Sequence, residues 1–369
     1  MRKRIFRYLK HVGITFLLLG ITIILFGLYH GASFRYAENP LMMNWNGDGP
    51  YVFAENDSTF VVNYIRGNQE QGFYLDKKEY ALNSEIPASC YFPLDSTRFE
   101  FTIQNEIRIP ENTTNGDFKI LALSDIESGF KTFRDFLIHN RVIDKKLNWT
   151  FKNGHLVLLG DFVDRDFSAT QVLWFIYKLE QEAAKKGGAP KYFHIAAILE
   201  RPQISLLGEN SFLGKWMASK NTIEQINGIL FTHGGLHPGL ANYRTNLDEI
   251  NQIVRNNYYK PYYPKVKKDL EQLLISTNTG ISWYRGYFKD NLKQKDVDRN
   301  LKAFHAKAIV VGHTLQSQVN RQFNGKVIGV DVKHPKDYSK SLPDKKSEGL
   351  LIEGKRFYRA LYTGKTEEI

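Results

Sequence analysis

The chain has 369 residues, of which 42% are hydrophobic and 24% are charged, enough to bury the core of at least one large domain. Its formal net charge is +11, but a good part of this comes from five basic residues among the first ten. The remainder carries no basic stripe interleaved with aromatic residues, which argues against a nucleic-acid partner. A single cysteine, Cys90, excludes an intramolecular disulfide, so packing of the core must stabilise the fold.

The N-terminus is predicted to be a membrane anchor. Residues 12–29 are uncharged and strongly apolar, and as a helix they would cross most of a hydrocarbon core about 30 Å thick. The basic tail at residues 1–11 predicts a cytoplasmic N-terminus, which places the rest of the chain on the extracytoplasmic side, the periplasm in a Gram-negative bacterium. The small residues at 31–33 would suit signal-peptide cleavage, but the apolar part of such a peptide is usually shorter, about 7 to 15 residues. We therefore expect an uncleaved single-pass anchor at residues 12–30.

Three segments follow the anchor. Residues 31–47 show no hydrophobic period and are predicted to be a linker. Residues 48–112 contain short β-branched and aromatic runs separated by Asn, Asp, Gly and Pro, which predict a small antiparallel β module with a spacer or lid role. Residues 113–369 are expected to form the main α/β domain.

Four apolar runs in the main domain end in side chains that can bind a metal. The first run precedes Asp125 and Glu127, the second precedes Asp161, and the third and fourth precede His233 and His313. The interval between the first two runs is the length of one βα crossover, which places consecutive parallel strands side by side. Because the carboxyl ends of such strands form the ligand-binding edge of an open α/β sheet, we expect these side chains to converge.

Carboxylate oxygens and imidazole nitrogens at one edge suit a pair of divalent ions. Two ions about 3.5 to 4 Å apart can share one carboxylate, lower the pKa of a bound water and hold phosphoryl oxygens. Asp161 is the best candidate for the shared ligand. Mixed Asp and His ligands favour Mn, Fe or Zn over Ca, because imidazole is a poor ligand for calcium.

The order of these motifs between Asp125 and Thr314 resembles that of the calcineurin-like metallophosphoesterases, and is similar to the Shewanella-like branch of serine/threonine-type phosphatases. This resemblance implies a layered α/β/β/α sandwich. It also implies hydrolysis of phosphomonoesters by attack of a metal-bound hydroxide at a dinuclear site. The substrate would be a phosphorylated protein or small molecule.

The resemblance also assigns roles to individual residues. Asp125 and Glu127 would hold the first ion, Asp161 would bridge the two, and His233 and His313 would hold the second.

Three further residues would take part in catalysis. Asp164 would orient a catalytic histidine or water, and Arg165 would bind the phosphate. Arg285, in the Trp-Tyr-Arg-Gly-Tyr segment, would be the second phosphate-binding arginine. Two guanidinium groups suit phosphate because each planar fork donates two charge-assisted hydrogen bonds.

Two departures from the family pattern bear on activity. Glu127 stands where the family has histidine, which shifts the ligand set toward harder ions. The family's Gly-Asn-His-Glu or Gly-Asn-His-Asp motif is missing, because no Asn is followed by His in the sequence. Residues 204–210 could form a degenerate third strand that lets Glu209 or Asn210 reach the metal. The alternative is a catalytically impaired or inactive phosphatase-like binding module.

Overall fold

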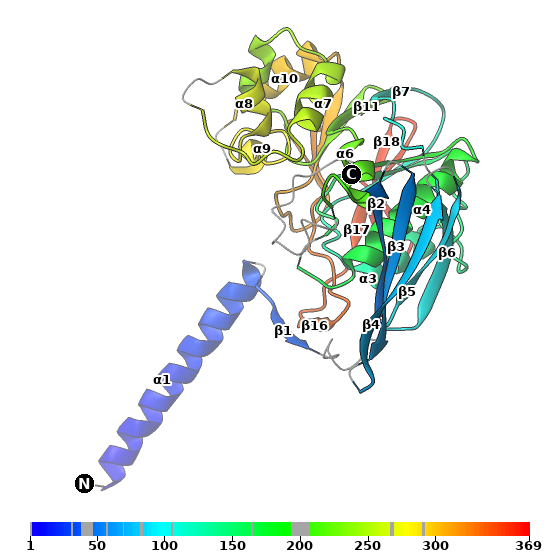
Figure 1. Ribbon diagram of the computed structural model, residues 1–369. Coiled ribbons are helices and arrows are strands. Elements are labelled where there is room, and N and C mark those ends of the chain that lie inside the picture. The colour runs from blue at the N-terminus through cyan, green and yellow to red at the C-terminus, as the bar shows by residue number, and fades with distance from the viewer. Residues whose placement is uncertain are drawn as a thin grey trace.

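The computed structural model describes the chain except for residues 1, 31, 38–46, 57, 69, 82–83, 105, 164, 193–206, 266–268 and 290–291. Its body contains two six-stranded sheets packed face to face (Figure 1). The first sheet has the order β10 (Ala189–Tyr192), β9 (His155–Leu158), β8 (Ile120–Leu123), β17 (Glu348–Glu353), β18 (Arg356–Leu361) and β19 (Thr366–Glu368). The second has the order β14 (Asn320–Gln322), β15 (Val327–Gly329), β13 (Ala308–Val311), β12 (Ile229–Thr232), β11 (Ile223–Ile226) and β7 (Thr113–Thr114).

Alternation along the strands fills three hydrophobic layers. In β8, Ile120 and Ala122 face the second sheet, while Leu121 and Leu123 face the helices on the outer side. Because successive side chains of a strand point to opposite faces, a strand buried on both faces reads as one continuous apolar run. This explains why the sequence pattern locates these strands.

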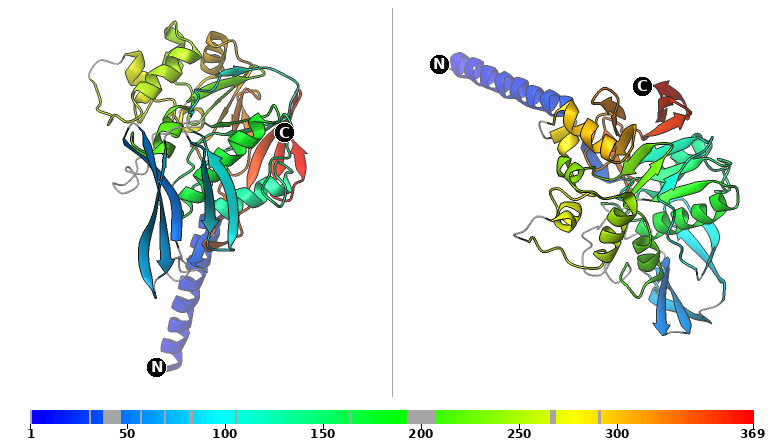
Figure 2. Two further views of the ribbon diagram at one scale, coloured as in Figure 1. Left: turned by 45° about the vertical axis from the view of Figure 1, so that its right-hand side comes forward. Right: turned by 90° about the horizontal axis from the view of Figure 1, so that it is seen from above.

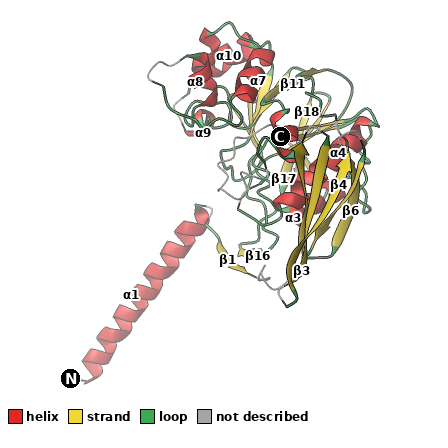
Figure 3. Ribbon diagram, viewed as in Figure 1, coloured by secondary structure: helices red, strands yellow, loops and turns green. Residues whose placement is uncertain are grey.

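Helices cover the outer face of each sheet (Figure 3). The first sheet packs against α3 (Phe130–His139) and α4 (Ala169–Ala184), and α6 (Phe212–Ala218) joins the same core. The second sheet packs against helices from the segment 238–303, namely η1 (Pro238–Asn242), α7 (Leu247–Asn256), α8 (Leu270–Ile275), α9 (Gly286–Lys289) and α10 (Gln294–Ala303). The predicted α/β/β/α sandwich is therefore confirmed.

The β-rich segment forms two small sheets on the outer face of α4. One contains β2 (Gly47–Asn56), β3 (Thr59–Asn68) and β4 (Gly72–Ala81), and the other pairs β5 (Ile86–Phe92) with β6 (Thr97–Ile103). Trp174 of α4 stacks on Phe101 with ring centroids 4.9 Å apart, and its indole N–H donates to the Pro50 carbonyl. The strands of both small sheets therefore pack into the same hydrophobic core as α3 and α4.

The N-terminal segment leaves the body as one long helix, α1 (Arg2–Tyr29), which Figure 2 shows in two further views. No residue of α1 is buried, and its length and composition suit either a membrane span or a signal sequence. Within the segment predicted as a linker, residues Phe34–Ala37 form β1, which pairs antiparallel with β16 (Ser339–Leu342). The partner strand lies at the other end of the sequence, so no local pattern indicated this pairing.

Candidate active site

The loops that follow β8 and β9 are joined by their backbones at the carboxyl edge of the first sheet. The amide of Asp125 donates to the Gly160 carbonyl at 3.0 Å, and the amide of Glu127 donates to the Asp161 carbonyl at 2.8 Å. These bonds continue the parallel pairing of the two strands. They explain how Asp125 and Asp161, 36 positions apart, become neighbours.

The loop after β13 closes on the first sheet because Gly312 has no side chain. A Cβ at Gly312 would overlap the Ser124 hydroxyl and lie 3.1 Å from Asp125 Oδ2. The amide of Gly312 donates to the His233 carbonyl at 2.7 Å, and that of His313 donates to Asp125 Oδ2 at 3.2 Å. This close approach brings the edges of both sheets together at one point.

Asp161, His233 and His313 converge there as a potential metal centre. Nε2 of His233 lies 3.1 Å from Nδ1 of His313 and 3.5 Å from Asp161 Oδ2. One ligand atom from each of the three residues lies within 4.8 Å of the others. Two imidazole nitrogens and a carboxylate oxygen facing one another suit a divalent ion of borderline softness.

The electrostatics of the two carboxylates also suit a cation. Burial raises the pKa of Asp125 to about 7, and the neighbouring Asp161 charge adds to this rise while His233 opposes it. Burial acts the same way on Asp161, but hydrogen bonding and the charge of His233 outweigh it and hold the pKa of Asp161 below its usual value. The two neighbouring carboxylates repel each other in their charged forms, so nearby positive charge stabilises them, and a metal ion would supply that charge.

The pKa values of the two histidines shift in opposite directions. Burial disfavours the charged form of His233, but the adjacent Asp161 and Asp125 outweigh burial and raise its pKa. Burial, the His233 charge and the Arg285 guanidinium lower the pKa of His313 to about 3. His313 is therefore neutral at physiological pH, the form in which imidazole binds metal.

Glu127 faces cations in this structure. Its Oε1 pairs with Arg165 at 2.8 Å, and its Oε2 lies 2.7 Å from Lys336 Nζ and 3.9 Å from Lys333 Nζ. Both carboxylate oxygens are thus engaged by basic side chains. This arrangement differs from the metal-ligand role that the resemblance implies, and it places Arg165 at the rim of the site.

Arg285 contacts His313 directly. Its guanidinium donates to the His313 carbonyl and approaches His313 Nδ1 at 3.4 Å. The segment that carries it is held close by Gly234, where a Cβ would lie 2.7 Å from the backbone of Ser282. The ring of Trp283 packs edge-on against His313. Asp164, which was predicted to orient a catalytic histidine or water, lies outside the described residues.

Left-handed backbone conformations occur at five of the candidate residues, among fourteen described non-glycine residues with positive φ. Asp125, Glu127, Asp161, Arg165 and His313 have φ values of 55°, 50°, 47°, 57° and 61°. The left-handed region costs a residue with a side chain about 1 to 3 kcal/mol where the conformation is sparsely populated, and such strain clusters at functional sites. Five candidates from the meeting edges of the two sheets share this conformation, which is consistent with a functional site there.

The sequence analysis missed Asp331. This buried carboxyl follows β15, which runs parallel to β13 and so ends at the same edge. Burial and the charges of Asp125, Glu127 and Asp161 raise the pKa of Asp331 to about 9. The run Val-Ile-Gly-Val before it carried the same signal as the other strand ends, an apolar strand that stops at an acid.

His334 and the segment after it were likewise not predicted from the sequence to lie near the site. Its Nε2 lies 2.9 Å from the carbonyl oxygen of Ser124, the residue before Asp125. No sequence motif marks this contact, because it joins residues about two hundred positions apart.

The two candidates for a degenerate third motif are described only in part. The Asn210 carbonyl accepts a hydrogen bond from the Ala54 amide of β2, and the charge of Glu209 raises the pKa of Tyr259, for which burial is the larger cause. Residues 204–206 lie outside the described residues. The observed contacts therefore connect this segment with the β2 sheet and the aromatic residues near 259.

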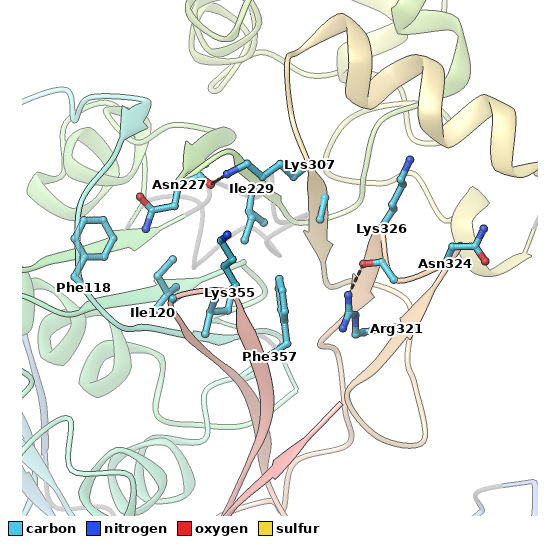
Figure 4. A pocket seen from close by; sticks show the side chains of 14 residues that line it. Phe118, Ile120, Asn227, Ile229, Lys307, Arg321, Asn324, Lys326, Lys355 and Phe357 are labelled. Carbon is cyan, nitrogen blue, oxygen red and sulfur yellow. Dashed lines mark hydrogen bonds between the residues drawn. The ribbon is translucent and has the colours of Figure 1, made fainter.

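One well-formed cavity lies away from the site (Figure 4). Its volume is about 320 Å³, and it opens near the first residues of β8, β12 and β13, at the amino edge of these strands. Basic side chains surround an apolar floor there, and none of the predicted site residues line it. A smaller cavity of about 190 Å³ adjoins the site through Trp283 and is lined by Tyr258, Tyr262 and Tyr263.

Comparison with known proteins agrees with this geometry. Residues 118–317 match the family model described as calcineurin-like phosphoesterase. The chain is 26% identical over 233 residues to Shewanella-like protein phosphatase 1 of Plasmodium berghei (strain Anka), a match that covers 54% of this chain and 61% of that protein.

Two solved structures resemble a larger part of the chain. The cold-active protein-tyrosine phosphatase of a psychrophilic Shewanella species superposes with a TM-score of 0.75 at 29% identity, covering 88% of this chain and 99% of that one. Another structure of a cold-active protein tyrosine phosphatase gives a TM-score of 0.74 at 30% identity, covering 88% of this chain and 97% of that one. The family match spans more than half of the chain and includes the strand ends that carry the candidate metal centre, so this protein belongs to the calcineurin-like phosphoesterase family.

Proposed function

We propose that this phosphatase hydrolyses phosphomonoesters at a centre that holds two divalent metal ions. The convergence of Asp161 from the first sheet with His233 and His313 from the second is the observation that carries the proposal. Asp161 would be shared between the ions, the two histidines would hold one of them, and Asp125 would hold the other. Mn, Fe or Zn would suit this donor set.

Bound divalent ions would supply Lewis acidity and a water of lowered pKa. The chain's own residues would then position the substrate. Arg285 contacts His313 and Arg165 pairs with Glu127, so their guanidinium groups would bind equatorial phosphoryl oxygens and stabilise the charge that develops there. Arg165 would be held toward the site by its ion pair with Glu127. Asp164 would orient a catalytic group, as the family resemblance implies.

The substrate class is proposed from the surroundings of the site. The solved relatives are named as protein-tyrosine phosphatases, and the cavity next to Trp283 is rich in tyrosine. Aromatic side chains stack favourably with aromatic groups. Phosphotyrosine peptides are therefore the first substrates to test, followed by other phosphoproteins and small phosphomonoesters.

We propose that α1 anchors the enzyme in a membrane, with the N-terminus in the cytoplasm and the catalytic unit outside it. Support comes from the length and apolar composition of α1 and from the basic residues that precede its apolar part.

Metal content and turnover test the catalytic proposal together. The purified full chain should contain two divalent ions per molecule and hydrolyse p-nitrophenyl phosphate with added Mn. His313→Ala should lose one ion and at least about a hundredfold in activity, because a catalytic ligand is removed. His305→Ala, which changes an exposed histidine away from the site, is the matched control and should retain both properties.

The second candidate function is a phosphatase-like binding module without turnover. The specific observation in its favour is that no Asn-His pair occurs in the sequence, so the family's usual ligand and acid are missing. A chain with one ion or none, and without turnover of p-nitrophenyl phosphate or phosphotyrosine peptide, would establish this alternative and reject the enzyme.

A further inference from the structure

Two exposed apolar patches lie outside the catalytic machinery. The ribbon patch consists of Phe34, Tyr36 and Leu342 in the β1–β16 pair, with 56 to 68% of each residue exposed. The hairpin patch consists of Phe73, Tyr74 and Leu75 at the start of β4, with 46 to 67% exposed. Phe73 and Leu75 point to one face of the edge strand β4 and Tyr74 to the other, so the hairpin patch exposes apolar side chains on both faces of the hairpin. Grouped exposed apolar side chains on a soluble domain mark surfaces that bind a partner or a membrane.

The ribbon has an apolar face and a polar face. Residues opposite each other in an antiparallel pair share a face, and faces alternate along the strand. Phe34 pairs with Leu342, so these two lie on the same face as Tyr36, two residues along, whose partner Lys340 is the one basic residue on this largely apolar face of the ribbon. Arg35 lies on the other face, where its charge acts on Lys333 beside Glu127. The polar face is therefore turned toward the catalytic unit and the apolar face away from it.

The ribbon is a fixed part of the catalytic unit. Immediately before β16, the carboxylate of Asp337 accepts hydrogen bonds from the Lys131 and Thr132 amides at the start of α3. The Tyr338 ring packs against Phe92 in the core, and its hydroxyl lies 3.1 Å from that of Ser168. These contacts hold the chain that leads from the active-site rim into β16, so the ribbon cannot move freely from the site.

The ribbon is also tied closely to α1. Only residues 30–33 separate the end of α1 at Tyr29 from Phe34. Five residue steps span at most about 18 Å. Any membrane that α1 crosses must therefore lie beside the ribbon.

The hairpin patch lies at the same end of the molecule. Figure 1 and the left view of Figure 2 both show the β3–β4 turn on the side of the body from which α1 leaves. Phe, Tyr and Leu are residue types that enter the boundary between headgroups and acyl chains, and tyrosine is enriched at that level in membrane proteins.

We propose that the ribbon and hairpin patches dock the catalytic unit onto the lipid bilayer as two separate contacts. The inference rests on the membrane anchor in the proposed function and extends it. A helix alone would leave the enzyme free to rotate above the bilayer, whereas two further contacts fix its orientation. The metal centre would then face phosphate groups presented at a constant height above the membrane.

The test uses the full chain in nanodiscs of phosphatidylethanolamine and phosphatidylglycerol, with and without doxyl-labelled phosphatidylcholine. An environment-sensitive NBD label is placed at Tyr36→Cys, Tyr74→Cys or Tyr263→Cys. The native Cys90 has no exposed surface and will not compete for label. Tyr263 is the matched control, since it is 73% exposed in the connection between α7 and α8. Figure 1 shows these two helices at the end of the body away from the β3–β4 turn.

Both Tyr36 and Tyr74 labels should shift their emission to shorter wavelength and be quenched by the doxyl lipid, while the Tyr263 label should be unchanged. Quenching at position 36 alone would overturn the proposal, because the tether by itself brings that position near lipid. A blue shift at 74 without lipid quenching would also overturn it and indicate a protein partner.

Failure of the docking proposal is distinguishable from failure of the proposed function. Turnover of p-nitrophenyl phosphate by the same samples reports catalysis independently of docking. The intact mass of the membrane-bound chain reports whether α1 is retained, and a chain lacking α1 would overturn both the anchor and the docking.

Discussion

At the scale of single residues, Glu127 is the candidate whose surroundings depart most from its predicted role. Its oxygens contact Arg165, Lys333 and Lys336. A carboxylate held by cations orders them, and a bidentate or charge-assisted contact contributes about 1.5 to 3 kcal/mol. We therefore interpret Glu127 as the residue that positions Arg165 for phosphate.

Glu127→Gln should keep the metal content and raise KM for p-nitrophenyl phosphate about tenfold, corresponding to the loss of one charge-assisted contact. Inorganic phosphate should inhibit the variant correspondingly less, since Arg165 is no longer held. Lys131→Gln, which removes a lysine paired with Asp135 on α3, is the control. Loss of one ion from Glu127→Gln would instead show that this residue is a metal ligand.

Gly312 is the second informative residue, because it allows the two sheet edges to meet. A side chain there would overlap Ser124 and crowd Asp125. Gly312→Ala should therefore reduce metal affinity and activity by at least about tenfold, by forcing the loop after β13 away from Asp125. Adding Ser124→Gly should restore part of both, whereas equal activity of Gly312→Ala and the natural chain would exclude a role for close approach.

At the scale of elements, α4 connects the β-rich segment with the sandwich. Trp174 stacks on both Phe101 and Phe212, with ring centroids 4.9 and 5.9 Å away. Its hydrogen bond to the Pro50 carbonyl links α4 to β2. The β strands and the main domain thus depend on one set of contacts.

Trp174→Ala should lower the free energy of unfolding by about 3 to 5 kcal/mol, since it leaves a large cavity in a shared core. Urea unfolding followed by tryptophan fluorescence and by circular dichroism should give one coincident transition, shifted to lower urea. Tyr263→Ala, at an exposed position, should leave the midpoint unchanged. Two separate transitions would show that the β strands unfold as an independent unit.

At the scale of the whole molecule, buried carboxyl groups at the site couple stability to pH. Burial raises the pKa of Asp125 to about 7 and that of Asp331 to about 9, with neighbouring carboxylates adding to each rise. The unfolded chain releases these protons near the ordinary value of Asp, 3.8. Between pH 4 and the raised values the folded state therefore binds more protons than the unfolded state, and stability falls as pH rises.

The metal-free protein should accordingly lose thermal stability from about pH 6.5 to pH 9, because the two raised carboxyls act alone there, whereas below the ordinary value of His313, 6.5, the lowered pKa of His313 opposes their effect. Addition of Mn should restore stability most at the alkaline end, because the ion replaces the protons that these carboxylates release. Melting curves across this range, with EDTA or Mn, provide the measurement. A Tm that rises with pH in EDTA would contradict the proposed charge arrangement.

The sequence alone determined the positions of the buried strands and the residues that follow them. Strands buried on both faces must be continuously apolar, so Asp125, Asp161, His233 and His313 stand out where each run stops. The order of these residues along the chain was enough to predict the family and the α/β/β/α sandwich. Both depend on the local hydrophobic pattern and on right-handed connections between strands.

The tertiary structure decided which distant groups meet. The pairing of β1 with β16, the cations around Glu127 and the place of Asp331 all join segments far apart in the chain. No hydrophobic periodicity or short sequence motif indicates any of these contacts. They depend on how the loops pack against one another at the edge of the folded sheet. The local hydrophobicity of the sequence marks where each strand ends, whereas the partners of a charged side chain are determined only when the whole chain has folded.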